Sequence, residues 1–219
     1  MKDKTKSIIT IALIIIFCIG AILGYSYIAQ RHGMRHGIEY LENGEYQKAY
    51  EKFEKAASKF SLGYTKQKVD SMYYEGESLY RLERYEDGIS VYDSILKHKE
   101  AGYGYAMKAL CYVGLEQEEK AVEICNQGID NCKTEGESYD VKIAILMKQK
   151  KYDQGLKVVN AALSQELVSG KAQIMFDRIS LYEEKLDYNT AYKYAKEYVK
   201  AYPKDKKGKK EVTFLKSRI

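Results

Sequence analysis

The most informative absence in this sequence is that of catalytic groups. Only three histidines occur in 219 residues, and two of them, His32 and His36, lie close together near the N-terminal end. The chain has no phosphate-binding glycine loop, dinucleotide fingerprint, nucleophile elbow, zinc-protease histidine pair or calcium loop. Its carboxylates are scattered at the spacing of solvated helix faces. We therefore expect no enzymatic activity, no cofactor and no metal site.

A basic surface is also missing from most of the chain. The formal net charge is +5, but residues 1–6 contribute +2 and residues 204–219 contribute +5, which leaves −2 for residues 7–203. Binding nucleic acid requires a basic face that neutralises phosphates, and the body of the chain has no excess of basic residues to form one. We therefore expect no nucleic-acid partner.

Charged side chains are absent from Ser7 to Gln30, a segment that contains nine isoleucines, two leucines and one phenylalanine. A helix of this length would extend about 36 Å, which exceeds the roughly 30 Å hydrocarbon core of a bilayer. Inserting these large apolar side chains is worth about −4 to −7 kcal/mol in total. The sequence thus predicts a transmembrane helix over residues 7–30, preceded by a basic N-terminal tail over residues 1–6.

A cleaved signal peptide is the alternative for this segment, because a short basic start precedes both kinds of sequence. The nearest small-x-small site for cleavage is Gly24-Tyr25-Ser26, and the apolar stretch is unusually long for a signal peptide. Tyr25 and Tyr27 also suit the aromatic belt at a membrane surface. We expect the segment to be retained as an anchor.

The charges beside this segment predict its orientation. Three lysines, Lys2, Lys4 and Lys6, precede the segment, whereas two arginines, Arg31 and Arg35, follow it. The positive-inside rule places the more basic flank in the cytoplasm. We therefore expect a single-pass membrane protein with a cytoplasmic N-terminus and an extracytoplasmic C-terminal part.

Two pairs of residues near the segment leave alternatives open. Gly20 and Gly24 form a Gly-x-x-x-Gly pair, which lets two membrane helices pack closely, so a homodimer is one alternative. His32 and His36 are one helical turn apart, the spacing of two ligands on one metal ion. A third ligand is missing nearby and the neighbouring residues are basic, so we expect these histidines to face lipid headgroups instead.

Small residues recur through the rest of the chain at nearly constant intervals. Ala49, Gly88, Ala121, Gly155 and Ala191 follow one another at spacings of 39, 33, 34 and 36 residues. Three residues before the small residue stands a tyrosine in every copy but the third. Nine residues before it stands a tyrosine or a leucine in every copy. Several columns therefore recur in register.

A period near 34 residues that divides into two helices resembles the tetratricopeptide repeat (TPR) family. Pro203 stands twelve residues after Ala191, in the family's proline position at the end of a repeat. The resemblance implies an all-α fold, a solenoid of about five helical hairpins over residues 31–203, preceded by the single transmembrane helix. Terminal repeats of such a solenoid need a polar outer face.

Residues 204–219 are expected to form a basic C-terminal linker and a capping helix. Lys204–Lys210 is basic and contains a glycine, which indicates a linker, and Glu211–Ile219 has the pattern of a short amphipathic helix. We expect this helix to cover the exposed end of the last repeat. Contact with an anionic surface is the alternative.

Two features break the even pattern of the repeats. In the first copy Gly44 is expected to make the turn, and Phe60–Thr65 a longer connection to the second copy. The third copy holds Cys111 and Cys125, with Cys132 just beyond, at spacings that match no zinc site. We expect these thiols to be buried and free, acting as small hydrophobes, with a redox or metal role as the alternative.

The TPR resemblance also implies a concave groove lined by the first helix of each pair. The residues at the family's groove positions are Tyr73, Glu77, Tyr80, Arg81, Tyr103, Ala106, Leu110, Asp140, Ala144, Met147, Phe176 and Ser180. Aromatic residues and arginine are enriched at binding hot spots. The lysines and asparagines with which some family members clamp an acidic C-terminal peptide are missing, because Met34 and Ile38 stand at their positions in the first copy.

These observations predict a membrane-anchored interaction module, a scaffold or assembly factor that binds a protein or peptide partner in its groove. One alternative is a structural membrane protein that associates with itself and has no foreign ligand. Another is an enzyme subunit that supplies substrate binding to a catalytic partner. The sequence does not separate this last alternative from the first.

Overall fold

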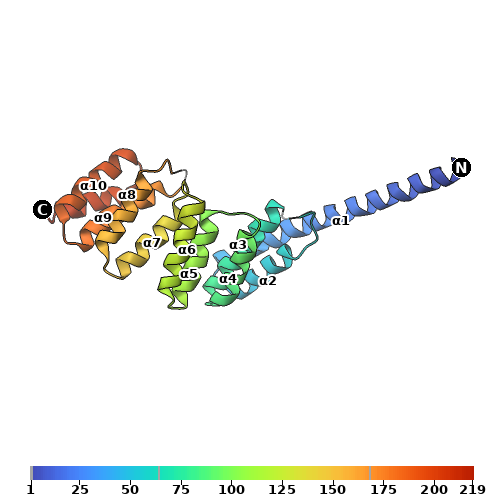
Figure 1. Cartoon of the computed structure of the whole chain (residues 1–219), viewed down its shortest axis with the longest axis horizontal. Helices are drawn as coiled ribbons and strands as arrows, with labels where there is room; N and C mark the ends of the chain where they lie inside the picture. Colours follow the sequence, from blue (N-terminus) through green and yellow to red (C-terminus); the bar gives the residue numbers. More distant parts are fainter. Residues whose placement is uncertain (1, 64, 168) are drawn as a thin grey trace. The chain divides into compact units, whose positions relative to one another are not determined.

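A computed structural model describes residues 2–63, 65–167 and 169–219, with side chains from residue 6 onward. Met1 of the predicted tail and Tyr64 of the predicted connection lie outside the described residues. The described chain contains eleven helices and no strand (Figure 1). They are α1 (Lys2–Glu42), α2 (Tyr46–Ala57), α3 (Lys66–Arg81), α4 (Tyr85–Leu96), α5 (Gly102–Gly114), α6 (Glu118–Asn131), α7 (Glu137–Lys148), α8 (Tyr152–Leu163), α9 (Lys171–Glu184), α10 (Tyr188–Ala201) and α11 (Lys206–Lys216).

The predicted helical hairpins are confirmed. Five pairs follow one another, from the end of α1 with α2 to α9 with α10. The turn inside each pair has one residue in the left-handed region of the backbone map, always five positions before the small residue. These residues are Gly44, Glu83, Glu116, Lys150 and Leu186, with φ between 58° and 75°. The turn therefore keeps a left-handed residue at the same position in every copy, even where the residue type changes.

The small-residue column lies on the second helix of each pair, where that helix packs closely against other helices. Ala49, Ala121 and Ala191 are all fully buried. A Cβ atom on Gly155 would lie 2.9 Å from Leu181 Cδ2, which is closer than real Cβ contacts come. Small side chains at this column allow neighbouring helices to approach each other, which explains why the spacing of these residues marks the repeat.

Residues 1–98 form the first compact unit, unit 1, with α1 to α4. The ring of Phe53 is fully buried and stacks on Tyr74, with 5.1 Å between ring centroids. A Cβ atom on Gly37 would lie 2.5 Å from the Phe53 ring, so α1 and α2 meet closely at this point. The α1 helix runs without a break from the predicted membrane segment into the first repeat.

Residues 99–219 form the second compact unit, unit 2, with α5 to α11. Its core contains two groups of buried side chains. The first consists of Tyr139, Ile143, Val159, Ala162, Ile174 and Leu181. The second consists of Phe176, Ile179, Ala191, Ala195, Tyr198 and Leu215. The first group joins the α7–α8 hairpin to α9, and the second joins the α9–α10 hairpin to α11, as expected for a repeat that buries its apolar face against the next element.

The cysteines of the third copy are buried and free, as predicted. Cys111 and Cys125 are fully buried, and Cys132 is 8% exposed. Burial raises the pKa of the Cys111 and Cys125 thiols to about 12. Both thiols therefore stay protonated at neutral pH and behave as small hydrophobic side chains.

The C-terminal helix begins earlier than the sequence predicted. The α11 helix starts at Lys206, so the prediction of a linker through Lys210 was wrong. The Asp205 side chain caps it, because Oδ1 accepts hydrogen bonds from the backbone of Lys207 at 2.7 Å and of Gly208 at 3.4 Å. Leu215 on this helix is fully buried in the core of the last repeat, so the helix covers that repeat as expected.

The N-terminal part of α1 extends away from the other helices of unit 1 (Figure 1). Residues Lys6–Glu42 of this helix are long and apolar enough to cross a membrane, with a mean hydropathy of 2.8 in the most apolar window. None of that window is buried, unlike the core helix of a soluble protein. A signal sequence near an N-terminus meets the same criteria of length and composition.

Candidate partner-binding groove

The predicted groove residues of unit 1 all lie on α3. Tyr73, Glu77 and Tyr80 are half-buried, and Arg81 is exposed. Arg81 forms an ion pair with Glu77 one turn away at 3.7 Å, and the ring of Tyr80 packs against Tyr85 at the start of α4, with 5.7 Å between centroids. This face of α3 is therefore polar and aromatic, and its charged pair is neutralised within the helix.

The predicted residues of α5 and α9 differ in their exposure. Tyr103 is 39% exposed, Leu110 is half-buried and Ala106 is buried. Phe176 is only 6% exposed, and its ring packs edge-on against Tyr198 with 5.5 Å between centroids. Phe176 is thus a core residue of the last hairpin and offers a partner almost no surface.

Between α7 and α9, within unit 2, the structure has a groove of about 530 Å³. Its lining comes from these two helices and from the start of α8: Asp140, Ala144, Met147, Lys148, Lys150, Tyr152, Gln173, Asp177, Ser180 and Glu184. Four of these residues, Asp140, Ala144, Met147 and Ser180, were predicted from the sequence. We call this cavity the α7–α9 groove.

Two carboxyl groups from different helices meet in the α7–α9 groove. Those of Asp140 and Asp177 lie within hydrogen-bonding reach of each other. Asp177 is 8% exposed, and its Oδ1 accepts a hydrogen bond from Gln173 Nε2 at 2.7 Å. Its Oδ2 is buried and has no donor. Two ionised carboxylates cannot hydrogen-bond each other, so the pair requires either a proton or another cation.

The surroundings of the pair favour a retained proton. Burial and the neighbouring Asp140 raise the pKa of Asp177 to about 8, although Lys207 acts in the opposite direction. Burial and the charge of Glu137 also raise the pKa of Asp140, while the hydrogen bond with Asp177 lowers it. A pKa of about 8 favours the protonated form of Asp177 near neutral pH.

A basic group is the ligand that best complements this pair. An ammonium or guanidinium group supplies both the positive charge and the hydrogen-bond donors that Asp177 Oδ2 lacks. Within the described part of the chain, no three histidine, cysteine or acidic side chains are placed to hold one metal ion. The donor set therefore suits the organic cation of a lysine, an arginine or a free amine better than a metal.

Two of the other charged residues in the α7–α9 groove, Lys148 and Glu184, have partners within the chain. Lys148 Nζ bonds the Glu118 carboxylate at 2.7 Å, which neutralises one of the two lysines in the lining. The Tyr152 hydroxyl donates to Glu184 Oε2 at 3.3 Å. Lys150, at the turn before α8, adds one exposed positive charge. The buried carboxyl pair is thus the group in the lining that most lacks a hydrogen-bond donor and a positive charge.

The sequence did not identify Asp177 as a groove residue. The family alignment places Phe176 at the groove position of the fifth copy, but α9 presents the next residue instead. The sequence did contain an indication of its role, because the acidic Asp177 stands between two apolar residues, Phe176 and Ile179, that are buried in the structure. A buried acidic residue at such a position requires a partner.

The two histidines near the predicted membrane segment do contact each other. His32 Nε2 and His36 Nε2 are 3.2 Å apart, and His36 Nδ1 lies 3.5 Å from Glu39 Oε2. Neither histidine belongs to a set of three ligands among the described residues. The arrangement is that of a surface contact along one turn of α1.

Comparison with known sequences identifies the first repeats. A family model described as tetratricopeptide repeat matches residues 34–105. No curated protein matches the chain significantly.

Comparison with solved structures finds the same fold. A thermophilic TPR protein from Thermus thermophilus is 16% identical, with a TM-score of 0.62, 85% of this chain covered and 98% of the other. A tetratricopeptide repeat protein from Parabacteroides merdae is 14% identical, with a TM-score of 0.56 and coverages of 87% and 73%. YrrB, described as a TPR protein with an unusual peptide-binding site, is 17% identical, with a TM-score of 0.50 and coverages of 84% and 90%. At these identities the likeness establishes the fold alone.

Proposed function

We propose that this chain, which has the fold of tetratricopeptide repeat proteins and matches the family model over residues 34–105, is a membrane-anchored interaction module. It would hold a protein or peptide partner near the membrane and serve as a scaffold or assembly factor. The proposal includes no catalysis and no cofactor, since repeats of this family generally act as interaction modules. A groove between the first helices of neighbouring hairpins is the natural place for the partner.

The α7–α9 groove is the observation that supports partner binding. It combines an open cavity of about 530 Å³ with a buried carboxyl pair whose Asp177 Oδ2 has no donor. Met147 and Ala144 add apolar lining beside the pair. A peptide that carries a lysine or arginine would place its cation between Asp140 and Asp177 and its neighbouring residues along α7.

The proposed location is a membrane with a single span. The α1 helix supports it by its length, its hydropathy and the exposure of its apolar window. The more basic flank, before the span, would lie in the cytoplasm, and unit 2 with its groove would lie outside the cytoplasm. The anchor would then hold the groove close to partners that share the membrane.

Site-specific photo-crosslinking in native cells tests the proposed function. A photoreactive amino acid at Ala144, an exposed residue of the α7–α9 groove, is expected to give a discrete adduct with a partner. The same probe at Asn160, an exposed residue on the second helix of that hairpin, serves as the matched control and is expected to give none. Equal adducts from both positions, or none from either, would contradict partner binding in the groove.

Self-association is the second candidate function. Gly20 and Gly24 are exposed on α1, and a Cβ atom at either position would meet no atom within 4 Å, so this helix face is open to a second copy. In this case crosslinks from Phe17, which is 77% exposed on the same helix, would have the size of a dimer of the chain. Self-association would be excluded by partner adducts from Ala144 together with no dimer-sized crosslink from Phe17.

A further inference from the structure

The packed face of α1 extends back into the predicted membrane segment. Gly37 is buried against Phe53, and the same helix face continues through Gln30 and Ser26, which are 3% and 6% exposed. These two residues lie within the span predicted over residues 7–30. Neighbouring positions on the opposite face, such as Tyr25 and Ile28, are about 70% exposed. Protein therefore covers one side of the last two turns of the apolar segment.

Helix length locates the membrane boundary on α1. Residues 7–26 would extend about 30 Å, which is the thickness of the hydrocarbon core, so a span that begins at Ser7 reaches the headgroup region at about Ser26. Tyr27, which is 45% exposed, then lies at the depth where tyrosine side chains are enriched. The buried residues Ser26 and Gln30 are consequently at the membrane surface.

The connection between α2 and α3 lies between two helix ends that both pack near this part of α1. At one end of it, a Cβ atom on Gly33 would lie 3.3 Å from Ala56 Cβ. At its other end, the first turn of α3 lines a groove together with Tyr27 and Ile28. Between these points Phe60 is 55% exposed and Leu62 is 70% exposed. Two large apolar side chains are thus displayed beside the end of the span.

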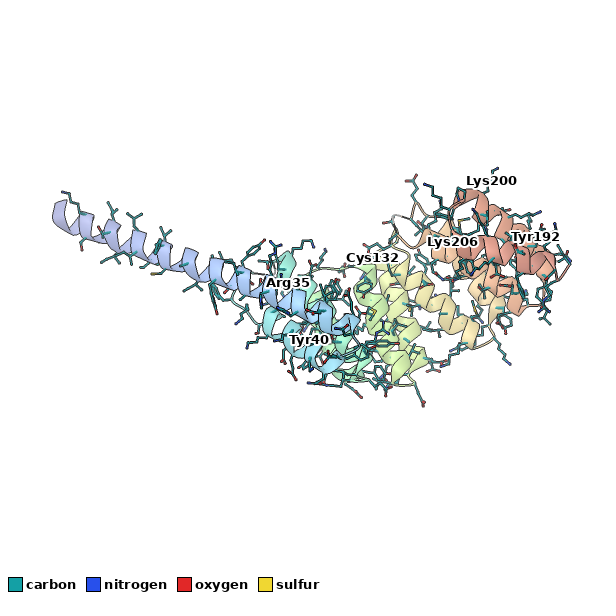
Figure 2. The ribbon with its side chains drawn as sticks, turned by 180° about the vertical axis from the view of Figure 1, so that it is seen from behind. Arg35, Tyr40, Cys132, Tyr192, Lys200 and Lys206 are labelled. Atoms are coloured by element: carbon teal, nitrogen blue, oxygen red, sulfur yellow. The ribbon has the colours of Figure 1, made fainter. Side chains whose placement is uncertain are left out.

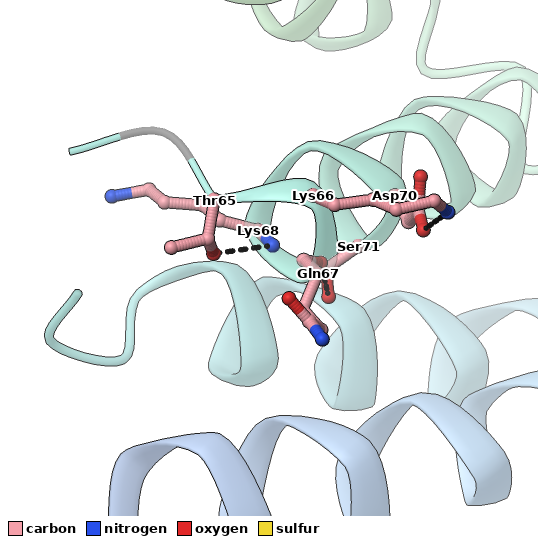
Figure 3. A network of polar contacts seen from close by, with 6 residues as sticks. All are labelled: Thr65, Lys66, Gln67, Lys68, Asp70 and Ser71. Carbon is pink, nitrogen blue, oxygen red and sulfur yellow. Dashed lines mark hydrogen bonds and ion pairs between the residues drawn. The ribbon is translucent and has the colours of Figure 1, made fainter. Parts of the chain in front are cut away.

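Basic residues accompany these apolar side chains. The groove between α1 and the start of α3 has a volume of about 740 Å³, and its lining includes Tyr27, Ile28, Arg31, Arg35, Lys66 and Gln67. Figure 3 shows the first turn of α3, with Thr65 capping the helix and Lys66 paired with Asp70 at 2.6 Å. Arg31 and Arg35 are exposed and lie one turn apart on α1, where Figure 2 labels Arg35. The two arginines have no ion pair within the described part of the chain.

We propose that this end of unit 1 is a bilayer-contact surface. Phe60 and Leu62 enter the boundary between headgroups and acyl chains, and Arg31 and Arg35 bind the phosphates of acidic phospholipids. The occupant is lipid because the surface continues directly from an apolar helix at the depth where that helix leaves the hydrocarbon. The inference rests on the membrane anchor proposed above, and it adds a second contact that fixes the tilt of unit 1 on the membrane.

Tryptophan fluorescence tests this surface directly, because the chain contains no tryptophan. Three single-tryptophan variants of the full chain, Phe17→Trp, Phe60→Trp and Tyr40→Trp, are reconstituted in vesicles of phosphatidylcholine and phosphatidylglycerol. The acyl chains of these vesicles carry bromine either near the glycerol or near the middle. Phe17 lies in the span, whereas Tyr40 lies on the same helix about 20 Å beyond Ser26.

We expect bromine near the glycerol to quench Phe60→Trp at least about twofold more than Tyr40→Trp, because interfacial side chains lie about 5–10 Å deep. Phe17→Trp is expected to respond most to bromine near the middle of the chains. If Phe17→Trp is quenched and Phe60→Trp is not, the contact surface is refuted while the anchor stands. If Phe17→Trp is not quenched, the anchor fails and the surface fails with it.

A separate comparison of vesicles tests whether Arg31 and Arg35 bind acidic headgroups. In the Phe60→Trp background, Arg31→Gln with Arg35→Gln is expected to weaken quenching in vesicles that contain phosphatidylglycerol. The same changes are expected to have little effect in pure phosphatidylcholine, where the surface is not anionic. Equal quenching with and without the arginines in both kinds of vesicle would refute the binding of acidic headgroups. Circular dichroism of each variant confirms that the helices are retained.

Discussion

Asp177 is an acidic residue whose surroundings disfavour its ionised form. It is 8% exposed, one of its oxygens has no donor, and its neighbour is another carboxyl group. Such a position costs stability whenever the carboxyl is ionised, so it persists in a folded chain only with a proton or a basic ligand. Stability and partner binding are therefore linked at this one side chain.

Replacing Asp177 with asparagine should remove a pH dependence of folding. The folded pKa of about 8 lies above the unfolded value of about 4. The stabilisation by the bound proton is therefore fully present below about pH 4 and is lost as the pH rises through about 8. Thermal unfolding of the full chain in detergent should show wild type losing stability between about pH 5 and pH 8, and Asp177→Asn losing less.

Asp153→Asn is the matched control for this experiment. Asp153 is exposed and pairs with Lys185 at 2.5 Å, and this partner lowers the pKa of Asp153. Its titration therefore lies below the tested range, and its substitution should leave the pH dependence unchanged. Equal pH dependence in wild type and Asp177→Asn would contradict the raised pKa.

Gly37 permits the closest helix contact in unit 1. An added methyl group would lie 2.5 Å from the Phe53 ring, so Gly37→Ala should force α1 and α2 apart. We expect a loss of about 1–3 kcal/mol in the free energy of unfolding, measured by denaturant titration in detergent. Gly20→Ala, with no atom within 4 Å, should cost nothing. Equal stability of Gly37→Ala and Gly20→Ala would contradict a tight contact between Gly37 and the Phe53 ring.

At the scale of helices, the hairpins could be predicted from the sequence because each repeat needs a small residue where its second helix packs against a neighbouring helix. Ala49 and Gly155 are examples, and such a column stays visible when the other residues change. The start of α11 could not be predicted in this way, because it depends on the Asp205 cap and on the close packing of Gly208, where a Cβ atom would lie 2.6 Å from the Tyr198 ring. Asp177 was missed because α9 presents a groove position shifted by one residue from the family pattern.

The shared backbone geometry of the hairpin turns gives a second test at this scale. Only the first copy has a glycine at the left-handed position, whereas Leu186 occupies it in the fifth copy with φ 61° and is 71% exposed. Leu186→Gly should relieve backbone strain and stabilise unit 2 by about 0.5–1 kcal/mol. Gly44→Ala should destabilise unit 1 by at least about 1 kcal/mol.

Thermal unfolding of each variant measures both effects. Lys185→Gly is the control for Leu186→Gly, because Lys185 is the residue before it and has φ −79°; this change also removes the ion pair of Lys185 with Asp153. Glycine there should destabilise by about 1 kcal/mol. Stabilisation by glycine at both positions, or at neither, would contradict the role assigned to the left-handed turn.

At the scale of the whole molecule, the two units carry different parts of the proposed function. Unit 1 contains the apolar helix and the surface expected to contact lipid. Unit 2 contains the α7–α9 groove with its carboxyl pair. The helical scaffold explains the separation, because each hairpin packs only against its neighbours and each unit has its own buried core.

Alkaline carbonate extraction of cell membranes tests the anchor. The full chain should stay in the membrane pellet, because an uncharged helix of about 20 residues holds it in the bilayer after ionic contacts are broken. A variant with Ile15→Lys and Ile19→Lys, two exposed positions on α1, should be released or fail to insert. Release of the full chain would contradict a retained span.

Panning a display library of random short peptides on the full chain in detergent tests the central claim most directly. We predict that bound peptides are enriched in lysine or arginine, and that Asp177→Asn and Asp140→Asn remove this enrichment, while Asp153→Asn keeps it. Enrichment of acidic peptides, or basic enrichment that survives both groove substitutions, would contradict the assignment of the α7–α9 groove as the site that holds a basic partner.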